Sequence, residues 1–194
     1  MNKKLLILTA VALIIFALTA CRPAKALAST TTRYATQTIK LRDKAGGKVL
    51  KKIKRNTAVT IIGKGGKKWI RVKYKGKRYV TVKKYLNTER CPGKKKAAEY
   101  IKYLHTRGPV TWHGRKYTYY TSRILPIYKL PVPGLHLDKN GMWCDKWDYI
   151  VLGSSRANKA ARVIFATPFG KYGKVYDTGT VSTPSWLCDV ATSW

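Results

Sequence analysis

Short alternations of apolar and polar residues recur along most of the chain, and this period of two predicts β-strands rather than helices. In WIRVKY, residues 69–74, the alternation places Ile70, Val72 and Tyr74 on one face of a strand. Further strands are expected at residues 49–55 and from residue 57 onward. The roughly 55 residues from Tyr34 to Leu86 suffice for one small antiparallel barrel and little more.

The same texture returns in the second half of the chain. Strands are expected at residues 110–112, 117–120, 149–153, 161–167, 174–177 and 187–191. Between them lies a segment rich in Pro and Gly, Leu125 to Gly141, which is too irregular for regular structure; loops of this length commonly carry function. About 85 residues with this strand spacing predict a second compact β-barrel.

One stretch after the first residues has helical spacing. GKKKAAEYIKYLH, Gly93 to His105, places Ala98, Ile101 and Leu104 on one face and is bounded by Pro and Gly on both sides. We interpret it as the joint between two domains. The expected fold class is therefore mainly β, with a first domain at 34–88, a helical linker at 89–109 and a second domain at 110–194.

The first residues have the three-part layout of a secretory signal: two lysines, an apolar run from Leu5 to Ala20, and a mixed segment. We expect a signal peptide at 1–28 and a polar tether at 29–33. Two processing routes stay open. Ala26-Leu27-Ala28 suits ordinary signal peptidase, whereas Leu18-Thr19-Ala20-Cys21 resembles a bacterial lipobox. In that case Cys21 would be lipidated and would anchor the protein to a membrane.

The chain carries 40 Lys and Arg residues against 8 Asp and Glu, a formal net charge of +32. Such a field attracts polyanions. For an exported protein these are anionic wall polymers and lipid head groups, so we expect no nucleic-acid partner. The alternative is a solvated surface that serves solubility. The acids are unevenly placed, since residues 33–90 contain only Asp43 and Glu89 and residues 91–194 contain six.

Two of those six acids are the candidate catalytic residues. Asp177 and Asp189 are twelve positions apart, which suits two strands joined by a loop and a shared cleft. Carboxylates are what acid/base cleavage of a glycosidic bond requires. Strand periodicity places Val175 and Asp177 on one face. The alternative is that Asp177 is a turn residue whose side chain satisfies nearby backbone N–H groups.

Other side chains complete the set of candidates. Trp112, Tyr119 and Tyr176 are candidate glycan-stacking aromatics, with packing as the alternative. The histidines share no metal spacing, so we expect neither a metal nor an organic cofactor. Three cysteines follow the signal. Export permits a disulfide, for which we favour Cys144 with Cys188, and free thiols acting as small apolar residues are the alternative.

Several motifs of the first domain recur in a known family. They are LR near its start, the KVL and VTIIG strands, the W-x-x-V-x-Y strand, the Gly76-Lys77 turn and the closing KYL. Through them the first domain resembles a bacterial SH3-like domain over nearly the whole of TIKLRDKAGGKVLKKIKRNTAVTIIGKGGKKWIRVKYKGKRYVTVKKYL. It departs from the family at Tyr79-Val80-Thr81, where Gly-Tyr-Val is usual. That family commonly docks on cell-wall peptidoglycan, so the resemblance implies a small barrel that targets the wall.

The second domain contains WHGRKYTYYTSRILP, LPVPGLHLDKNG, DYIVLGSS, TPFGKYGKVYDTG and CDVATSW. These look like exported proteins with a three-aspartate domain, a double-psi-type β-barrel that rare lipoprotein A-like proteins and A-type lytic transglycosylases share. In those relatives an Asp-Thr-Gly motif and a later Asp line the cleft, which match Asp177 and Asp189. The family's first aspartate falls at Gly153 or Ser154 here.

The second resemblance implies acid/base cleavage of peptidoglycan glycan strands. Asp177 or Asp189 would protonate the glycosidic oxygen, and the same group would later accept a proton from a sugar hydroxyl. A non-catalytic binder of anionic wall polymers is the alternative function. Peptidoglycan and anionic wall polymers are the expected partners in either case, with a membrane reached only through lipid at Cys21.

Overall fold

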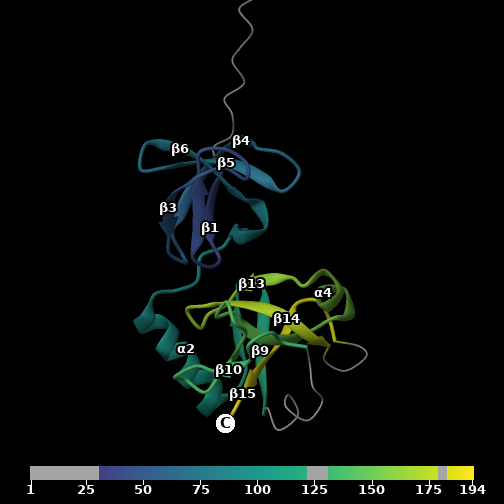
Figure 1. Cartoon of the computed structure of the whole chain (residues 1–194). Helices are drawn as coiled ribbons and strands as arrows, with labels where there is room; N and C mark the ends of the chain where they lie inside the picture. Colours follow the sequence, from purple (N-terminus) through teal and green to yellow (C-terminus); the bar gives the residue numbers. More distant parts are fainter. Residues whose placement is uncertain (1–30, 122–130, 179–182) are drawn as a thin grey trace, which may run out of the picture.

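The computed structural model describes residues 31–121, 131–178 and 183–194, and it is mainly β, as predicted. Two strand-rich parts follow one another along the chain, each built on its own sheet (Figure 1). The first contains β1 to β7 and the second β8 to β15. The expected signal peptide and Cys21 lie outside the described residues.

The first sheet has seven strands in the order β3-β2-β6-β5-β4-β1-β7. Its alternation matches the prediction, because Val72 is fully buried whereas Arg71 and Lys73 are exposed. Lys75 and Gly76 both have positive φ, as a two-residue hairpin turn between β5 and β6 requires. The strands are β1 (Thr32–Ala35), β2 (Ile39–Arg42), β3 (Val49–Ile53), β4 (Ala58–Lys64), β5 (Trp69–Tyr74), β6 (Lys77–Val82) and β7 (Leu86–Asn87), with the 3₁₀ turn η1 (Lys83–Tyr85) before the last.

The second sheet mixes parallel and antiparallel pairs. Its main path is β10-β11-β12-β15-β9-β8, and β14 pairs with both β12 and β13. The pairs β12 with β14 and β9 with β15 are parallel, and the other pairs are antiparallel. The strands are β8 (Val110–Trp112), β9 (Arg115–Thr121), β10 (His136–Leu137), β11 (Trp143–Cys144), β12 (Ile150–Ser154), β13 (Ile164–Ala166), β14 (Tyr172–Thr178) and β15 (Leu187–Thr192).

The predicted helix belongs to the second domain. α2 (Lys94–Arg107) buries Leu104 completely in a core that also holds Val110 and Tyr117. It is therefore a packed part of that domain as well as the connection to it. A second helix, α4 (Arg156–Ala161), was not predicted; the side chain of Ser155 caps it by accepting a hydrogen bond from the backbone N–H of Asn158. Because α4 extends to Ala161, the strand expected at 161–167 begins only at Ile164.

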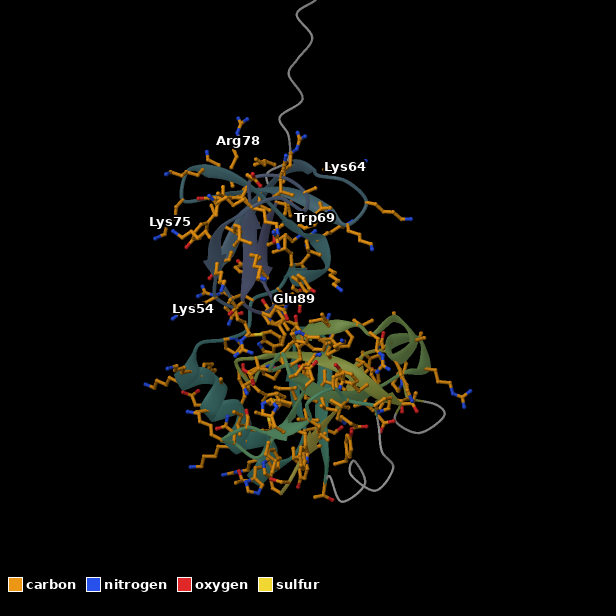
Figure 2. All side chains as sticks on the ribbon, viewed as in Figure 1. Lys54, Lys64, Trp69, Lys75, Arg78 and Glu89 are labelled. Carbon is orange, nitrogen blue, oxygen red and sulfur yellow. The ribbon has the colours of Figure 1, made fainter. Side chains whose placement is uncertain are left out.

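Side-chain contacts join the two domains. Arg55 donates hydrogen bonds to the backbone carbonyl and to the carboxylate of Asp148, both at 2.9 Å. The hydroxyls of Thr36 and Tyr149 lie 2.7 Å apart in a buried hydrogen bond. Glu89 lies at the junction (Figure 2), where its carboxylate pairs with a guanidinium of the second domain. The domains are thus held together by specific polar contacts.

The disulfide predicted between Cys144 and Cys188 is wrong. Both thiols are free and buried, and burial raises the pKa of each to about 12. Cys144 pairs with Ile150 of β12, whereas Asp189, the neighbour of Cys188, pairs with Gly153. Three residues of strand span about 10 Å, which exceeds the separation that a disulfide bridges. The cysteines act as small apolar core residues, the alternative reading of the sequence.

Candidate acid/base site

The two candidate aspartates lie on strands that flank β12. Gly153 pairs with Asp177 of β14 along one edge of β12 and with Asp189 of β15 along the other. Partners directly opposite in a sheet point to the same face, so both carboxylates lie on one side of Gly153. Their Cα atoms are two strand spacings apart, about 10 Å. The structure therefore brings together the two acids that the sequence singled out.

A β-bulge sets this arrangement. Leu152 pairs with Val175, but the next residue of β12, Gly153, pairs with Asp177 instead of Tyr176. Because β14 has one extra residue at the bulge, the side chains that follow it point to the opposite face of the sheet from the one that strict alternation would give. Val175 lies in the main core of the second domain, whereas Asp177 faces the other side with Gly153. The prediction that Val175 and Asp177 share a face is therefore wrong.

The missing side chain at position 153 leaves space between the two acids. A Cβ there would lie 3.5 Å from the Cβ of Asp189 and 3.8 Å from the Cε1 of Tyr120, which are ordinary contact distances. The ring of Tyr120 thus reaches over the strand toward Gly153. The sequence resemblance expected an aspartate near this position, and a Cβ here would meet only ordinary contacts.

The environment of Asp189 suits a proton donor. Burial and, second, the negative charge of Asp177 raise the pKa of Asp189. Thr118 of β9, its partner in the parallel register, donates a hydrogen bond to the carboxylate. Because the folded chain holds this proton more tightly than the unfolded chain, stability falls as pH rises from the ordinary carboxyl pKa through the raised one. A carboxyl that retains its proton at higher pH can serve as a general acid.

Tyr120 is a site residue that the sequence did not separate from the neighbouring aromatics. Its hydroxyl is buried and has no hydrogen-bond partner within the described part of the chain. Burial, followed by the charges of Asp177 and Asp189, raises the pKa of Tyr120, so the phenol stays protonated. Thr118 and Tyr120 are two residues apart on β9 and therefore share a face of the strand. That spacing was the only feature of the sequence that could have placed Tyr120 beside the acids.

Of the candidate glycan-stacking aromatics, only Tyr176 packs with the apolar cluster on the acids' face of the sheet, which also holds Val151 and Ala191. Tyr176 is only 3% exposed and donates a hydrogen bond of 2.6 Å to Asp145, so it packs in the interior. Tyr119 faces away from Asp189 and lies against Trp194. Trp112 packs on two apolar clusters and on the ring of His113. Packing, the alternative reading, describes Tyr176 and Trp112.

The described residues contain no group of three or more His, Cys, Asp or Glu side chains that could hold a metal ion. No helix within them has the length and apolar character to cross a membrane.

A scan against protein-family models found no match, and neither did searches of curated proteins and of solved structures. The two family resemblances therefore rest on the sequence motifs alone.

The first prediction concerns the coupling of the two acids. Replacing Asp177 with Asn removes a negative charge beside Asp189 and should lower the pKa of Asp189, though not to the ordinary value, because burial remains. A ¹³C NMR titration of the Asp189 carboxyl group measures this. Glu99→Gln, an exposed change on α2, is the control and should leave the titration unchanged. An unaltered pKa of Asp189 in Asp177→Asn would show that the two carboxylates do not interact.

Proposed function

We propose that the protein is an exported cell-wall protein that binds peptidoglycan and cleaves its glycan strands by acid/base chemistry. The pairing of Asp177 and Asp189 with the two edges of Gly153 is the observation that carries this proposal. It gives two carboxylates on one face, one of them with a raised pKa, as glycosidic cleavage requires. The signal-like first residues support export.

The chemistry can be written with named groups. Protonated Asp189 donates its proton to the glycosidic oxygen as the bond to the anomeric carbon breaks, and ionised Asp177 stabilises the positive charge that develops on the sugar. Asp189 is then a carboxylate. It accepts the proton of a sugar hydroxyl whose oxygen attacks the same anomeric carbon, so that the acid is regenerated and an anhydro ring closes.

The second prediction tests Asp189 directly. Asp189→Asn keeps the shape and the oxygen that accepts from Thr118, but it cannot donate an acidic proton. Release of anhydro-muropeptides from purified cell walls, measured by mass spectrometry, should fall by about 10²- to 10⁴-fold, the usual contribution of a general acid.

Glu99→Gln is the matched control for that assay, because it also exchanges one carboxylate for an amide and leaves release unchanged. Thermal unfolding of Asp189→Asn shows whether the variant is folded. Equal release by the folded variant and the wild type would remove Asp189 from the mechanism.

A non-catalytic binder of anionic wall polymers is the second candidate, favoured by the charge of the first domain. Residues 33–90 carry twenty Lys and Arg residues against two acids. The side chains of Lys54, Lys64, Lys75 and Arg78 project outward from this domain (Figure 2). A surface of one sign attracts a polyanion without any shaped pocket.

The third prediction separates charge attraction from specific sugar contacts. If the first domain holds the wall by charge, binding to purified walls should weaken at least about tenfold between 0.15 M and 1 M salt, since the screening length falls from about 8 Å to about 3 Å. A pull-down assay across salt concentrations measures this.

A matched pair of variants locates the contact. Replacement of Lys64, Lys75 and Arg78 by Gln should weaken wall binding more than replacement of Lys94, Lys95 and Lys102 on α2, because the first set lies on the docking domain. The two sets are comparable since each removes three charges. Equal loss from the two sets would contradict docking through the first domain.

A further inference from the structure

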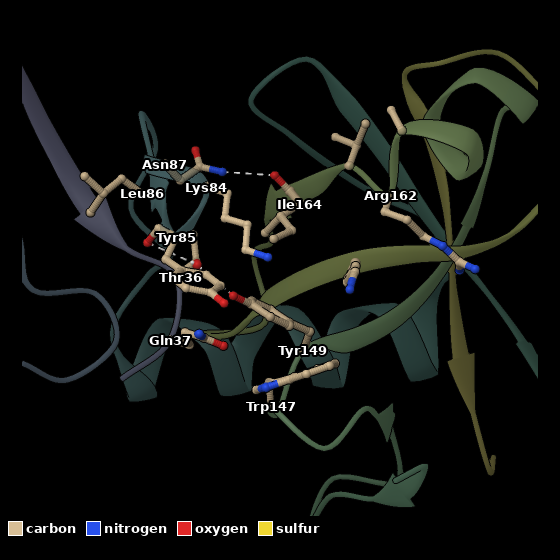
Figure 3. A pocket seen from close by; sticks show the side chains of 13 residues that line it. Thr36, Gln37, Lys84, Tyr85, Leu86, Asn87, Trp147, Tyr149, Arg162 and Ile164 are labelled. Atoms are coloured by element: carbon tan, nitrogen blue, oxygen red, sulfur yellow. Dashed lines mark hydrogen bonds between the residues drawn. The ribbon is translucent and has the colours of Figure 1, made fainter. Parts of the chain in front are cut away.

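A cavity of about 430 Å³ lies where the two domains meet. Thr36, Gln37 and the segment 84–87 line it from the first domain, and residues of the second domain complete it. Two hydrogen bonds cross the junction beside it, one between the hydroxyls of Thr36 and Tyr149 and one from the Asn87 amide to the carbonyl of Ile164 at 3.0 Å (Figure 3). Domain junctions are common places for small-molecule sites, and this volume is in their usual range of about 300–1,000 Å³.

The side chains that line the cavity carry positive charge. Lys84, Arg162 and Lys174 line it, no lining residue is acidic, and none of the three cations forms an ion pair with any residue that the structure describes. Burial lowers the pKa of Lys174; Asp145 opposes this, and the charges of Arg162 and Lys84 add to the lowering. An anion between these side chains would relieve that repulsion and stabilise the charged ammonium.

An aromatic platform stands beside the cations. Trp147 lines the cavity and is 42% exposed, although it is a large apolar side chain. The ammonium groups of Lys146 and Lys174 lie 4.6 and 5.3 Å from the centre of its ring. Figure 3 shows Lys84 reaching from the first domain toward Tyr149, with Trp147 on the other side of Tyr149. An exposed indole offers a flat face to an amphipathic ring, and the neighbouring cations bind its charged substituent.

We propose that this inter-domain cavity binds one anionic sugar unit. Its carboxylate or phosphate contacts Lys84 and Lys174, and its ring lies against Trp147. The choice of a sugar rests on the wall-glycan function proposed above, but the site itself does not rest on cleavage, because neither Asp177 nor Asp189 lines the cavity. The ligand would contact both domains at once and so strengthen their docking.

The fourth prediction is tested by ¹⁵N NMR titration of the whole protein with N-acetylmuramic acid and with N-acetylglucosamine 1-phosphate. The two probes share an anionic group on a sugar but represent the glycan strand and a phosphate-bearing wall polymer. Saturable shifts should be confined to the cavity, including the indole N–H of Trp147. Neutral N-acetylglucosamine should bind at least about tenfold more weakly, the effect of one charge-assisted hydrogen bond.

Matched variants locate the site. Lys174→Gln should weaken binding about tenfold, whereas Lys102→Gln, which removes the same charge from an exposed position on α2 outside the cavity, should have no effect. A second comparison does not involve charge. Trp147→Ala should weaken binding, whereas Trp186→Ala, which removes another exposed tryptophan, should not. Asp189→Asn should bind the probes normally, so loss of cleavage and loss of this site are distinguishable.

The outcomes divide cleanly. Cavity shifts with either anionic probe support the site, and the stronger probe identifies the source of the anion. The proposal is overturned if neither probe produces saturable cavity shifts, or if Lys174→Gln and Lys102→Gln weaken binding equally, since attraction would then be diffuse.

Discussion

The pairing of Gly153 with an aspartate on each edge of β12 is the constraint on which the site depends. All five residues of β12, Ile150–Ser154, are buried, so both faces of the strand are committed to packing. Leu152 lies in the main core, and a slip of one residue would exchange it with Gly153. Apolar packing therefore fixes the register that places Asp177 and Asp189 on either side of Gly153, and the position of the acids needs no contact between them.

This placement has an energetic cost that the fold carries. Two carboxylates share a face with Val151, Ala191 and the ring of Tyr120, and burial there disfavours the charge of Asp189. The buried phenol of Tyr120 adds a polar group without a partner among the described residues. A protein selected for stability alone would place apolar residues there. Groups held at a cost, with a shifted pKa and a mutual interaction, are typical of functional sites.

The sequence predicted the periodic parts of the molecule and missed what depends on distant contacts. The strands at residues 69–74 and 174–177 were found because alternation is local. The bulge beside Gly153 was not, since one unpaired residue leaves no trace in a pattern of alternating residues. The prediction of a disulfide between Cys144 and Cys188 was wrong for a similar reason. That both cysteines lie in one domain does not show where the strand register places them. The six-residue helix α4 is too short for helical periodicity to reveal it.

The inter-domain cavity could not be predicted at all, because its lining comes from segments that are distant in the sequence. Lys84 and Trp147 line the same cavity only because Arg55, Asp148 and their neighbours fix how the domains dock. Burial opposes ionisation of Asp148, yet Lys171 and Arg55 hold the pKa of its carboxyl below the ordinary value. The stabilisation from the Arg55–Asp148 ion pair is therefore fully present above the ordinary carboxyl pKa and is lost as the pH falls through the lowered one.

The most direct test of the central claim is a measurement of nuclear Overhauser contacts from the backbone protons of Gly153. The pairing of Gly153 predicts cross-strand contacts to Asp177 on one side and to Asp189 on the other. Contacts to Tyr176 in place of Asp177, or to neither aspartate, would contradict the bulged register and with it the acid pair.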